Sequence, residues 1–479
     1  MKRMLSATQF ARLLGDWRSR EADYLALAGA VHRLVLDGRV PPGVRLPAER
    51  EAALVLGASR TTVTAAYRRL RESGFLTSRQ GAGSWTSVPD GHRVATSGLW
   101  SPAGEDDVLD LGCAALPAPP QLADAVREAA DELPGYSAGS GYTPTGLAPL
   151  RAAVAERYTE RGLPTTPEQV MITTGAQQAF DLALRLLLSP GETALVEVPT
   201  YANALVALAA HRARVAGYGL PGTGWDADEL IATLRQIRPR VAYLLPDFHN
   251  PTGHLMPATT RERLVAATHP AGTDLVVDET FAELSLTGDP MPPPVAAFDR
   301  HARVVTIGGM SKAYWGGLRI GWIRAAGPVI QRLAALRVGA DMGSPVLEQL
   351  VAGRLIARAA EIIPAQRATL LSRRDALVAA LRAECPEWRF TVPTGGMSMW
   401  VELDAPVSTA LAAAAEQRGV RVAAGPRFGV DGLMERFVRL PYTLTESQLT
   451  DVVRRLRQAR EDVDAGGPAR TQSALDIVA

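Results

Sequence analysis

The chain has 479 residues, of which 47% are hydrophobic and 21% are charged, and its formal net charge is +1 at pH 7. This length exceeds what one hydrophobic core usually supports, so we expect at least two domains. Apolar runs fall short of the roughly 18 residues of a membrane span, and the opening residues lack a signal-peptide core. Two cysteines, Cys113 and Cys385, exclude a disulfide framework, so we expect a cytoplasmic protein with no membrane partner.

The charge is distributed unevenly along the chain. Residues 1–90 carry 14 Lys and Arg against 8 Asp and Glu, whereas the remaining residues carry 37 Lys and Arg against 42 Asp and Glu. The chain therefore combines a basic amino-terminal module with a mildly acidic body. Such an asymmetry favours nucleic acid as a partner of the basic module.

The basic module has the pattern of a helix-turn-helix followed by a β-hairpin. Helical spacing of apolar residues predicts a helix over 24–36, and a second helix is predicted from Pro47 to about Leu56. A glycine turn with Ser59 as N-cap precedes a third helix over 60–72, and two short strands then form a wing. In a helix-turn-helix, the second helix of the motif enters the major groove of DNA. The spacing alone fits a small helical domain with solvated arginines equally well.

The specific residues favour the DNA-binding interpretation. The stretch "DGRVPPGVRLPAERE…GASRTTVTAAYRRLRESGFLTSRQGAGSW" resembles the winged-helix domain of GntR-type transcription factors. Many members of that family carry an arginine where this chain has Thr64, which we expect to face outward, so one family contact is absent. The residues that the resemblance assigns to contacts with double-stranded DNA are Arg50, Ser59, Arg60, Thr61, Thr62, Gln80 and Gly81.

A segment without periodicity separates the two halves. Residues 88–107 are rich in Gly, Ser, Pro and Asp, which predicts a flexible linker over 90–109. Such a linker is long enough for the domain over 22–89 to pack on either subunit of a dimer. The alternative is a surface loop within one larger domain.

From Asp110 onward, apolar runs rich in β-branched residues repeatedly stop at glycine or polar residues and alternate with helical segments. This pattern predicts an α/β domain with a buried, mostly parallel sheet. Ligands gather at the carboxyl ends of the strands in such sheets. The residues that we therefore expect to converge on one pocket are Gly175, Tyr201, Asn250, Asp278 and Lys312.

These residue types together match the chemistry of pyridoxal 5′-phosphate. The amine of Lys312 can form a Schiff base, and Asp278 can pair with a protonated ring nitrogen. Asn250 can donate to an oxyanion, Tyr201 can stack on a ring, and a helix start at Gly175 can bind a phosphate. Each residue alone also fits an ordinary role, such as a surface lysine, a helix cap or a turn. Their order and spacing favour a common site.

Residues 110–461 resemble a fold-type I, aspartate-aminotransferase-like domain. The motifs "TTGAQQAFDLAL", "VPTYANAL", "HNPTG", "VVDET", "SKAYWGGLRIGW" and "RFVRLPY" occur in the order that this family has. The resemblance implies a large α/β domain, a smaller carboxyl-terminal α+β subdomain and pyridoxal 5′-phosphate as cofactor. We predict that residues 462–479 form a disordered tail, and no metal site is expected.

The resemblance also assigns roles to residues of the site. Lys312 would form the Schiff base, Asp278 would pair with the ring nitrogen, and Asn250 would bond the phenolic oxygen. Tyr201 would stack on the ring. Arg439, helped by the Gly112 backbone, would clamp an α-carboxylate. The residues assigned to the phosphate are Gly175, Ala176, Ser311 and Arg319, together with Tyr142, which would reach the phosphate of the partner subunit in a homodimer.

Two positions depart from the family pattern. Phe281 stands where a tyrosine is expected, and Gly309 stands where a serine is common. The phenolic oxygen and the phosphate therefore each lose one hydroxyl donor, which suggests that fast transamination is not the function of this site. His249, next to Asn250, either faces the ligand or is a hydrogen-bonded structural histidine.

A GntR-type winged helix joined to an aminotransferase-like domain is the architecture of MocR-type regulators. Our leading hypothesis is a transcriptional regulator that binds an operator and senses pyridoxal 5′-phosphate, or an amine or amino acid effector, through a Schiff base at Lys312. The first alternative is an active aminotransferase with an appended DNA-binding domain. The second is a structural DNA-binding dimer with a degenerate pocket.

Overall fold

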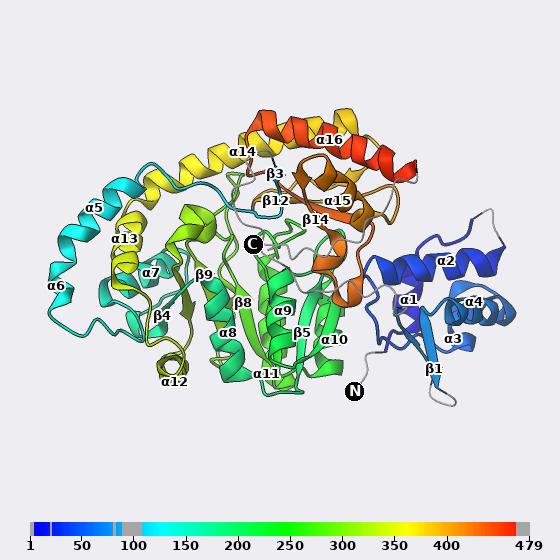
Figure 1. Ribbon diagram of the computed structural model, residues 1–479. Coiled ribbons are helices and arrows are strands. Elements are labelled where there is room, and N and C mark those ends of the chain that lie inside the picture. The colour runs from blue at the N-terminus through cyan, green and yellow to red at the C-terminus, as the bar shows by residue number, and fades with distance from the viewer. Residues whose placement is uncertain (1–3, 20–21, 80–82, 89–107, 466–479) are drawn as a thin grey trace.

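The computed structural model describes residues 4–19, 22–79, 83–88 and 108–465. These residues form a small amino-terminal domain, which we call the head, and a larger part, which we call the body (Figure 1). The head comprises described residues up to Val88, and the body begins at Val108. An α/β body with a mostly parallel sheet and a winged helix-turn-helix head confirm the predicted fold class.

The head follows the predicted pattern with two differences. Ser59 caps the helix Arg60–Glu72 as expected, because its hydroxyl accepts a hydrogen bond from the Thr62 amide at 3.0 Å. The helix predicted from Pro47 begins two residues later, at Glu49. A further helix precedes residue 22 and buries Phe10 and Leu14 in the head core. The elements are α1 Ala7–Leu14, α2 Asp23–Leu36, α3 Glu49–Leu56, α4 Arg60–Glu72, and the antiparallel strands β1 Leu76–Arg79 and β2 Gly83–Thr86.

The body is built on a seven-stranded sheet. The strand order is β4-β10-β9-β8-β7-β5-β6, and β10 runs antiparallel to both of its neighbours while the other pairings are parallel. The carboxyl ends of the parallel strands therefore meet at one edge. The strands are β4 Val170–Thr173, β5 Thr193–Val198, β6 Arg214–Gly219, β7 Val241–Leu244, β8 Asp274–Asp278, β9 Val304–Gly309 and β10 Gly321–Arg324.

Helices cover both faces of this sheet. On β7, Ala242 and Leu244 belong to one hydrophobic cluster, whereas Val241 and Tyr243 belong to another, because successive side chains of a strand point to opposite faces. The first cluster contains residues of α7 Ala148–Glu160, α10 Ala227–Ile237, α11 Ala258–Ala271 and α13 Val346–Ala357. The second contains residues of α8 Ala176–Leu187, α9 Ala202–Ala210 and α12 Gly327–Val338.

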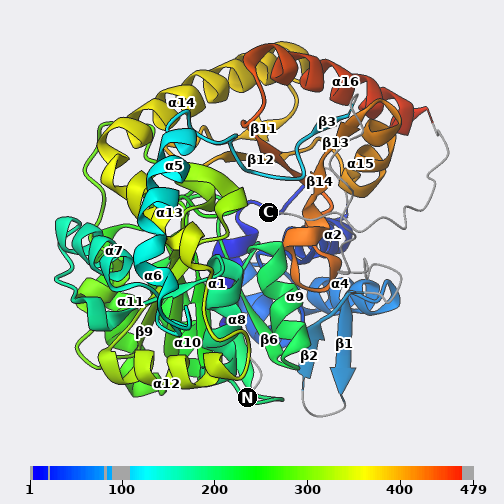
Figure 2. The ribbon, with the colours of Figure 1, turned by 60° about the vertical axis from the view of Figure 1, so that its left-hand side comes forward.

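A smaller subdomain lies over the top of the sheet, and the long helix α14 arches across it (Figure 2). Its antiparallel sheet has the order β11-β12-β15-β14, and β3 pairs in parallel with β13 beside it. Within the described ranges, no helix is long and apolar enough to cross a membrane. The remaining elements are α5 Leu122–Glu132, α6 Pro134–Ser137, α14 Ala359–Glu384, α15 Ser408–Gln417, α16 Glu446–Asp464, β3 Leu109–Asp110, β11 Arg389–Phe390, β12 Ser398–Glu402, β13 Val420–Arg421, β14 Ala423–Ala424 and β15 Phe437–Pro441.

Candidate functional site

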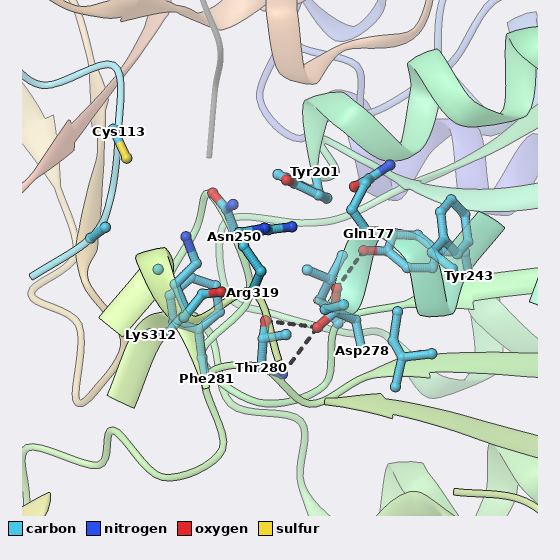
Figure 3. A pocket seen from close by; sticks show the side chains of 17 residues that line it. Cys113, Gln177, Tyr201, Tyr243, Asn250, Asp278, Thr280, Phe281, Lys312 and Arg319 are labelled. Carbon is cyan, nitrogen blue, oxygen red and sulfur yellow. Dashed lines mark hydrogen bonds between the residues drawn. The ribbon is translucent and has the colours of Figure 1, made fainter. Parts of the chain in front are cut away.

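A cavity with an empty volume of about 810 Å³, its mouth included, opens at the carboxyl edge of the large sheet (Figure 3). Gly175 lies at its rim, against the guanidinium of Arg319. The parallel strands bring these residues together because their carboxyl ends share one edge. The predicted site residues that line the cavity are Ala176, Tyr201, Asn250, Asp278, Ser311, Lys312 and Arg319.

Lys312 places a primary amine inside this cavity. It follows β9 on a short π-helical turn, η4 Ser311–Trp315, and its Nζ donates a hydrogen bond to the Ala114 carbonyl at 2.9 Å. The pKa of this amine is lowered to about 8, chiefly by burial; the Cys113 thiol and the Asp278 carboxylate oppose the shift, and the Arg439 guanidinium adds to it. A larger fraction of the amine is therefore neutral near physiological pH than in an ordinary lysine.

Lysine is also a rare residue type in this chain. Of the 51 Lys and Arg residues in the sequence, only Lys2 and Lys312 are lysines. A guanidinium stays protonated and does not form a Schiff base, so arginine can replace lysine at surface positions but not in this reaction. The scarcity of lysine is a sequence signal that singles out Lys312.

Asp278 ends β8 and points into the same cavity (Figure 3). One carboxylate oxygen accepts a hydrogen bond from the Tyr243 hydroxyl at 2.8 Å, and the other accepts from the Thr280 amide at 3.0 Å and hydroxyl at 2.8 Å. Burial raises the pKa of Asp278, and these hydrogen bonds lower it. Three donors therefore hold the carboxylate in one orientation. Sequence reasoning missed Tyr243, whose only signal is a phenol inside an otherwise aliphatic strand.

The start of α8 offers a site for an anion. Gly175, the N-cap, has φ of 83°, and a Cβ there would lie 2.6 Å from Nη2 of Arg319. A Cβ on Gly321 would lie 2.5 Å from the carbonyl carbon of Gly175. The two glycines thus allow the guanidinium and β10 to approach the helix start closely. The amides at the helix start, Arg319 and the Ser311 hydroxyl are donors that suit a phosphate group.

Arg439, on β15, is not among the residues that line the cavity, and its side chain is fully buried. Its guanidinium donates to Oδ1 of Asn250 at 3.4 Å and to the carbonyl of Gly112, and it lies 5.1 Å from the Phe428 ring centroid. Its Nε has no hydrogen-bond partner among the described residues. Burial lowers the pKa of Arg439 to about 10. A buried cation with a free donor suits a carboxylate ligand.

Two residues named from the sequence lie outside this constellation. Tyr142 does not line the cavity of its own chain and is 63% exposed. His249 is fully buried, with Nε2 3.1 Å from Oε2 of Glu197 and Nδ1 3.0 Å from the Thr252 hydroxyl. These contacts support the structural interpretation of His249, which fixes the turn that carries Asn250. The described ranges hold no group of three or more His, Cys, Asp or Glu residues that could bind a metal ion.

The described members of the predicted DNA-contacting set lie at the amino-terminal end of α4 and on α3. The expectation that Thr64 faces outward is wrong: it is partly buried, and its hydroxyl donates to Oε2 of Glu49 at 2.7 Å, which ties α4 to α3. Gln80 and Gly81 lie outside the described residues. The exposed members of the predicted set are Arg50, Ser59, Arg60 and Thr61, whereas Thr62 is partly buried.

Comparison with known proteins divides the chain in the same way. Residues 106–456 match the family "Aminotransferase class I and II", and residues 23–85 match "Bacterial regulatory proteins, gntR family". The HTH-type transcriptional regulator TauR of Rhodobacter capsulatus is 28% identical over 85% of this chain and 90% of its own length. The probable rhizopine catabolism regulatory protein MocR of Rhizobium meliloti is 28% identical over 60% of this chain and 62% of its own.

Among solved structures, the alpha-aminoadipate aminotransferase LysN of Thermus thermophilus superimposes with a TM-score of 0.68 at 32% sequence identity. The likeness covers 75% of this chain and 93% of that protein, which was solved in complex with N-(5′-phosphopyridoxyl)-L-leucine. The body of this chain thus has the fold of an enzyme whose structure holds a phosphopyridoxyl group.

The lowered pKa of Lys312 predicts a distinctive pH dependence. Only the neutral amine attacks an aldehyde, so the rate at which pyridoxal 5′-phosphate binds covalently should rise with pH and level off above about 8. An ordinary lysine would give a midpoint above about 10. Absorbance spectroscopy of the cofactor-free protein, mixed with the cofactor over a range of pH, measures this rate. Lys2→Arg should leave the profile unchanged and Lys312→Arg should abolish the reaction; a midpoint near 10 would contradict the assignment.

Proposed function

Because this chain belongs to the aminotransferase class I and II family and joins that domain to a gntR-family regulatory domain, as MocR-type regulators do, we propose that it is a transcriptional regulator that senses a small molecule at Lys312. The observation that carries the proposal is the coexistence, in one chain, of a buried amine pocket and an exposed recognition-helix start. The head binds an operator, and the body responds to pyridoxal 5′-phosphate or to an effector that carries an amino group.

The cofactor of this family is pyridoxal 5′-phosphate, and the residues of the cavity fit it. When bound, it supplies an aldehyde that links covalently to amines and exchanges one amine for another. Lys312 offers the amine, Asp278 the carboxylate for the ring nitrogen, and Asn250 the amide for the phenolic oxygen. Tyr201 would stack on the ring. Gly175, Ala176, Ser311 and Arg319 would hold the phosphate.

The geometry also indicates the class of effector. Arg439 is a buried cation with a free donor, and both Arg439 and Lys312 lie close enough to Cys113 for it to raise their pKa values. A ligand with an amino group for exchange at the cofactor and a carboxylate for Arg439 satisfies both cations at once. This combination describes an amino acid or a closely related amino carboxylate.

The working form is a homodimer in this proposal. Tyr142 and Met342 are both exposed, and they flank the close contact in which Gly343 lies against the Thr143 backbone. Tyrosine and methionine are enriched at subunit interfaces, so two such exposed side chains close together favour an interface here. Tyr142 would then reach the phosphate bound by the partner subunit.

A second candidate function is transamination. Lys312, Asp278 and Arg439 retain the chemical groups that such a reaction needs. Phe281 supplies no hydroxyl; its ring lies 5.6 Å from Nζ of Lys312. Conversion of the bound cofactor to its amine form by a panel of amino acids, followed by turnover with a keto acid, would favour this candidate. A binding spectrum without turnover favours the regulator.

Replacement of Lys312 tests the sensing mechanism. We expect Lys312→Ala to bind the operator with an affinity close to that of the cofactor-free wild type, because the head is unchanged, but to lose the shift in affinity caused by pyridoxal 5′-phosphate or amino acids. Fluorescence anisotropy with and without these compounds measures the shift. Lys2→Arg, the chain's other lysine, is the matched control. A Lys312→Ala protein that still responds would rule out the mechanism.

Replacement of Arg60 tests the DNA-binding surface. Arg60→Ala should weaken operator binding by roughly 10- to 100-fold, because an arginine at a recognition-helix start contributes about 1–3 kcal/mol to base recognition. The absorbance spectrum of the bound cofactor should not change. Arg382→Ala, which removes an exposed charge from α14, is the control. Equal operator affinity for the two variants would show that Arg60 does not contribute to DNA binding.

A further inference from the structure

The head packs directly against the body of the same chain. Its hydrophobic core includes three residues of the body, Val198, Leu433 and Met434, all of them buried. The amide of Met434 donates a hydrogen bond to the carbonyl of Leu36, the last residue of α2, at 2.7 Å. The helix that ends at this contact thus enters the core of the DNA-binding domain.

Glycines make this approach unusually close. A Cβ on Gly38 would lie 2.3 Å from Cε of Met434 and 2.8 Å from Cγ1 of Val198. On the body side, a Cβ on Gly219 would lie 2.4 Å from the carbonyl oxygen of Arg39. The segment between α2 and α3 therefore packs so closely against the body that a single added Cβ would clash. We call the contact between Leu36–Pro41 and Val198, Gly219 and Met434 the docking contact.

Both body segments that make the docking contact continue into the cavity. Val198 ends β5, and Tyr201, three residues later, lines the cavity. Met434 lies five residues before Arg439, and its carbonyl accepts a hydrogen bond from the amide of Phe437, the first residue of β15. Tyr201 and Arg439 are thus each linked to the docking contact by a short stretch of chain. We call these stretches, residues 198–201 and 434–439, the two tethers.

The two tethers are also joined to each other. The amide of Thr200 donates to the carbonyl of Phe428 at 2.9 Å, and the Phe428 ring lies against the Arg439 guanidinium. Thr200 and Phe428 are fully buried, so displacement of either tether requires the other to move. A change at Tyr201 or Arg439 is therefore passed to the docking contact through packed groups.

We propose that binding of a ligand in the cavity changes the position of the head through the docking contact. This inference rests on the proposed function. A ligand that stacks on Tyr201 and pairs with Arg439 shifts the two tethers, and the shift reaches α2 through Leu36 and Gly38. Because α2 packs along α4 in the head core, the recognition helix is repositioned with it.

The docking contact includes a titratable group, the carboxyl of Asp37. Burial raises the pKa of Asp37 to about 6, while Arg436 of the body lowers it and Glu402 of the body raises it; Arg39 and Arg33 of the head also lower it. At neutral pH Asp37 is therefore mostly ionised, so the docking contact holds a carboxylate that interacts with Arg436 and Glu402 of the body.

Two glycines of the body provide a matched pair for the test. Gly219→Ala places a methyl group against the backbone of Arg39, whereas Gly222→Ala, three residues away, meets no atom within 4 Å, and neither glycine has a positive φ. We expect Gly219→Ala to keep the visible absorbance of bound pyridoxal 5′-phosphate, because Gly219 does not line the cavity. Hydrogen exchange at the Met434 amide should become faster, since its partner is the Leu36 carbonyl.

The decisive readout is the change in operator affinity that pyridoxal 5′-phosphate causes in each full-length protein. Wild type and Gly222→Ala should show the same change, of about fivefold or more, as expected for a coupling of about 1 kcal/mol. In Gly219→Ala the change should fall below about twofold. Met434→Ala, which removes the side chain that meets Gly38, should act in the same direction.

These experiments distinguish a failure of the docking mechanism from a failure of the proposed function on which it rests. A wild-type protein whose operator affinity never responds overturns the proposed function, and the inference with it. A wild type that responds, beside Gly219→Ala and Met434→Ala proteins that respond equally, overturns the inference alone. Faster exchange at the Met434 amide in Gly219→Ala together with an unchanged response also overturns it, because the docking contact is then disrupted without any effect on the response.

Discussion

The burial of one primary amine is the constraint on which the rest of the body depends. Taking the ammonium form of Lys312 out of water costs free energy, so burial lowers the pKa of this amine. A hydrogen bond to the Ala114 carbonyl offsets part of the cost. A neutral amine in a closed site is a nucleophile, and the groups around it suit the ligand that it captures. Parallel strands bring Asp278 and Asn250 to it because their carboxyl ends share one edge.

Much of this arrangement follows from the sequence. Apolar runs that stop at polar residues predict where strands end, and strand ends in a parallel sheet predict which residues meet. The order of strands does not follow from such runs, so the hydrogen bond between Tyr243 on β7 and Asp278 on β8 was not foreseen. Helix α1 was missed for a different reason: its mixed charges hide the apolar face formed by Phe10 and Leu14.

Contacts between distant segments are the other part that the sequence does not specify. Thr64 looked outward-facing because its partner, Glu49, lies on another helix. Nothing in the sequence marks Gly38 and Gly219 as contact residues, yet each permits an approach that a Cβ would block. Local patterns therefore located the two functional halves of the molecule, whereas the way in which they touch required the three-dimensional structure.

In the proposed mechanism, a pocket for an amine-binding cofactor controls a DNA-binding head. Its most direct test is fluorescence anisotropy of a labelled duplex from upstream of the gene for this protein, titrated at physiological salt with and without pyridoxal 5′-phosphate, against a scrambled duplex. We expect tight binding to the native duplex only, with an affinity that the cofactor alters. Equal, salt-sensitive binding to both duplexes, unchanged by the cofactor, would reflect phosphate contacts alone and would contradict it.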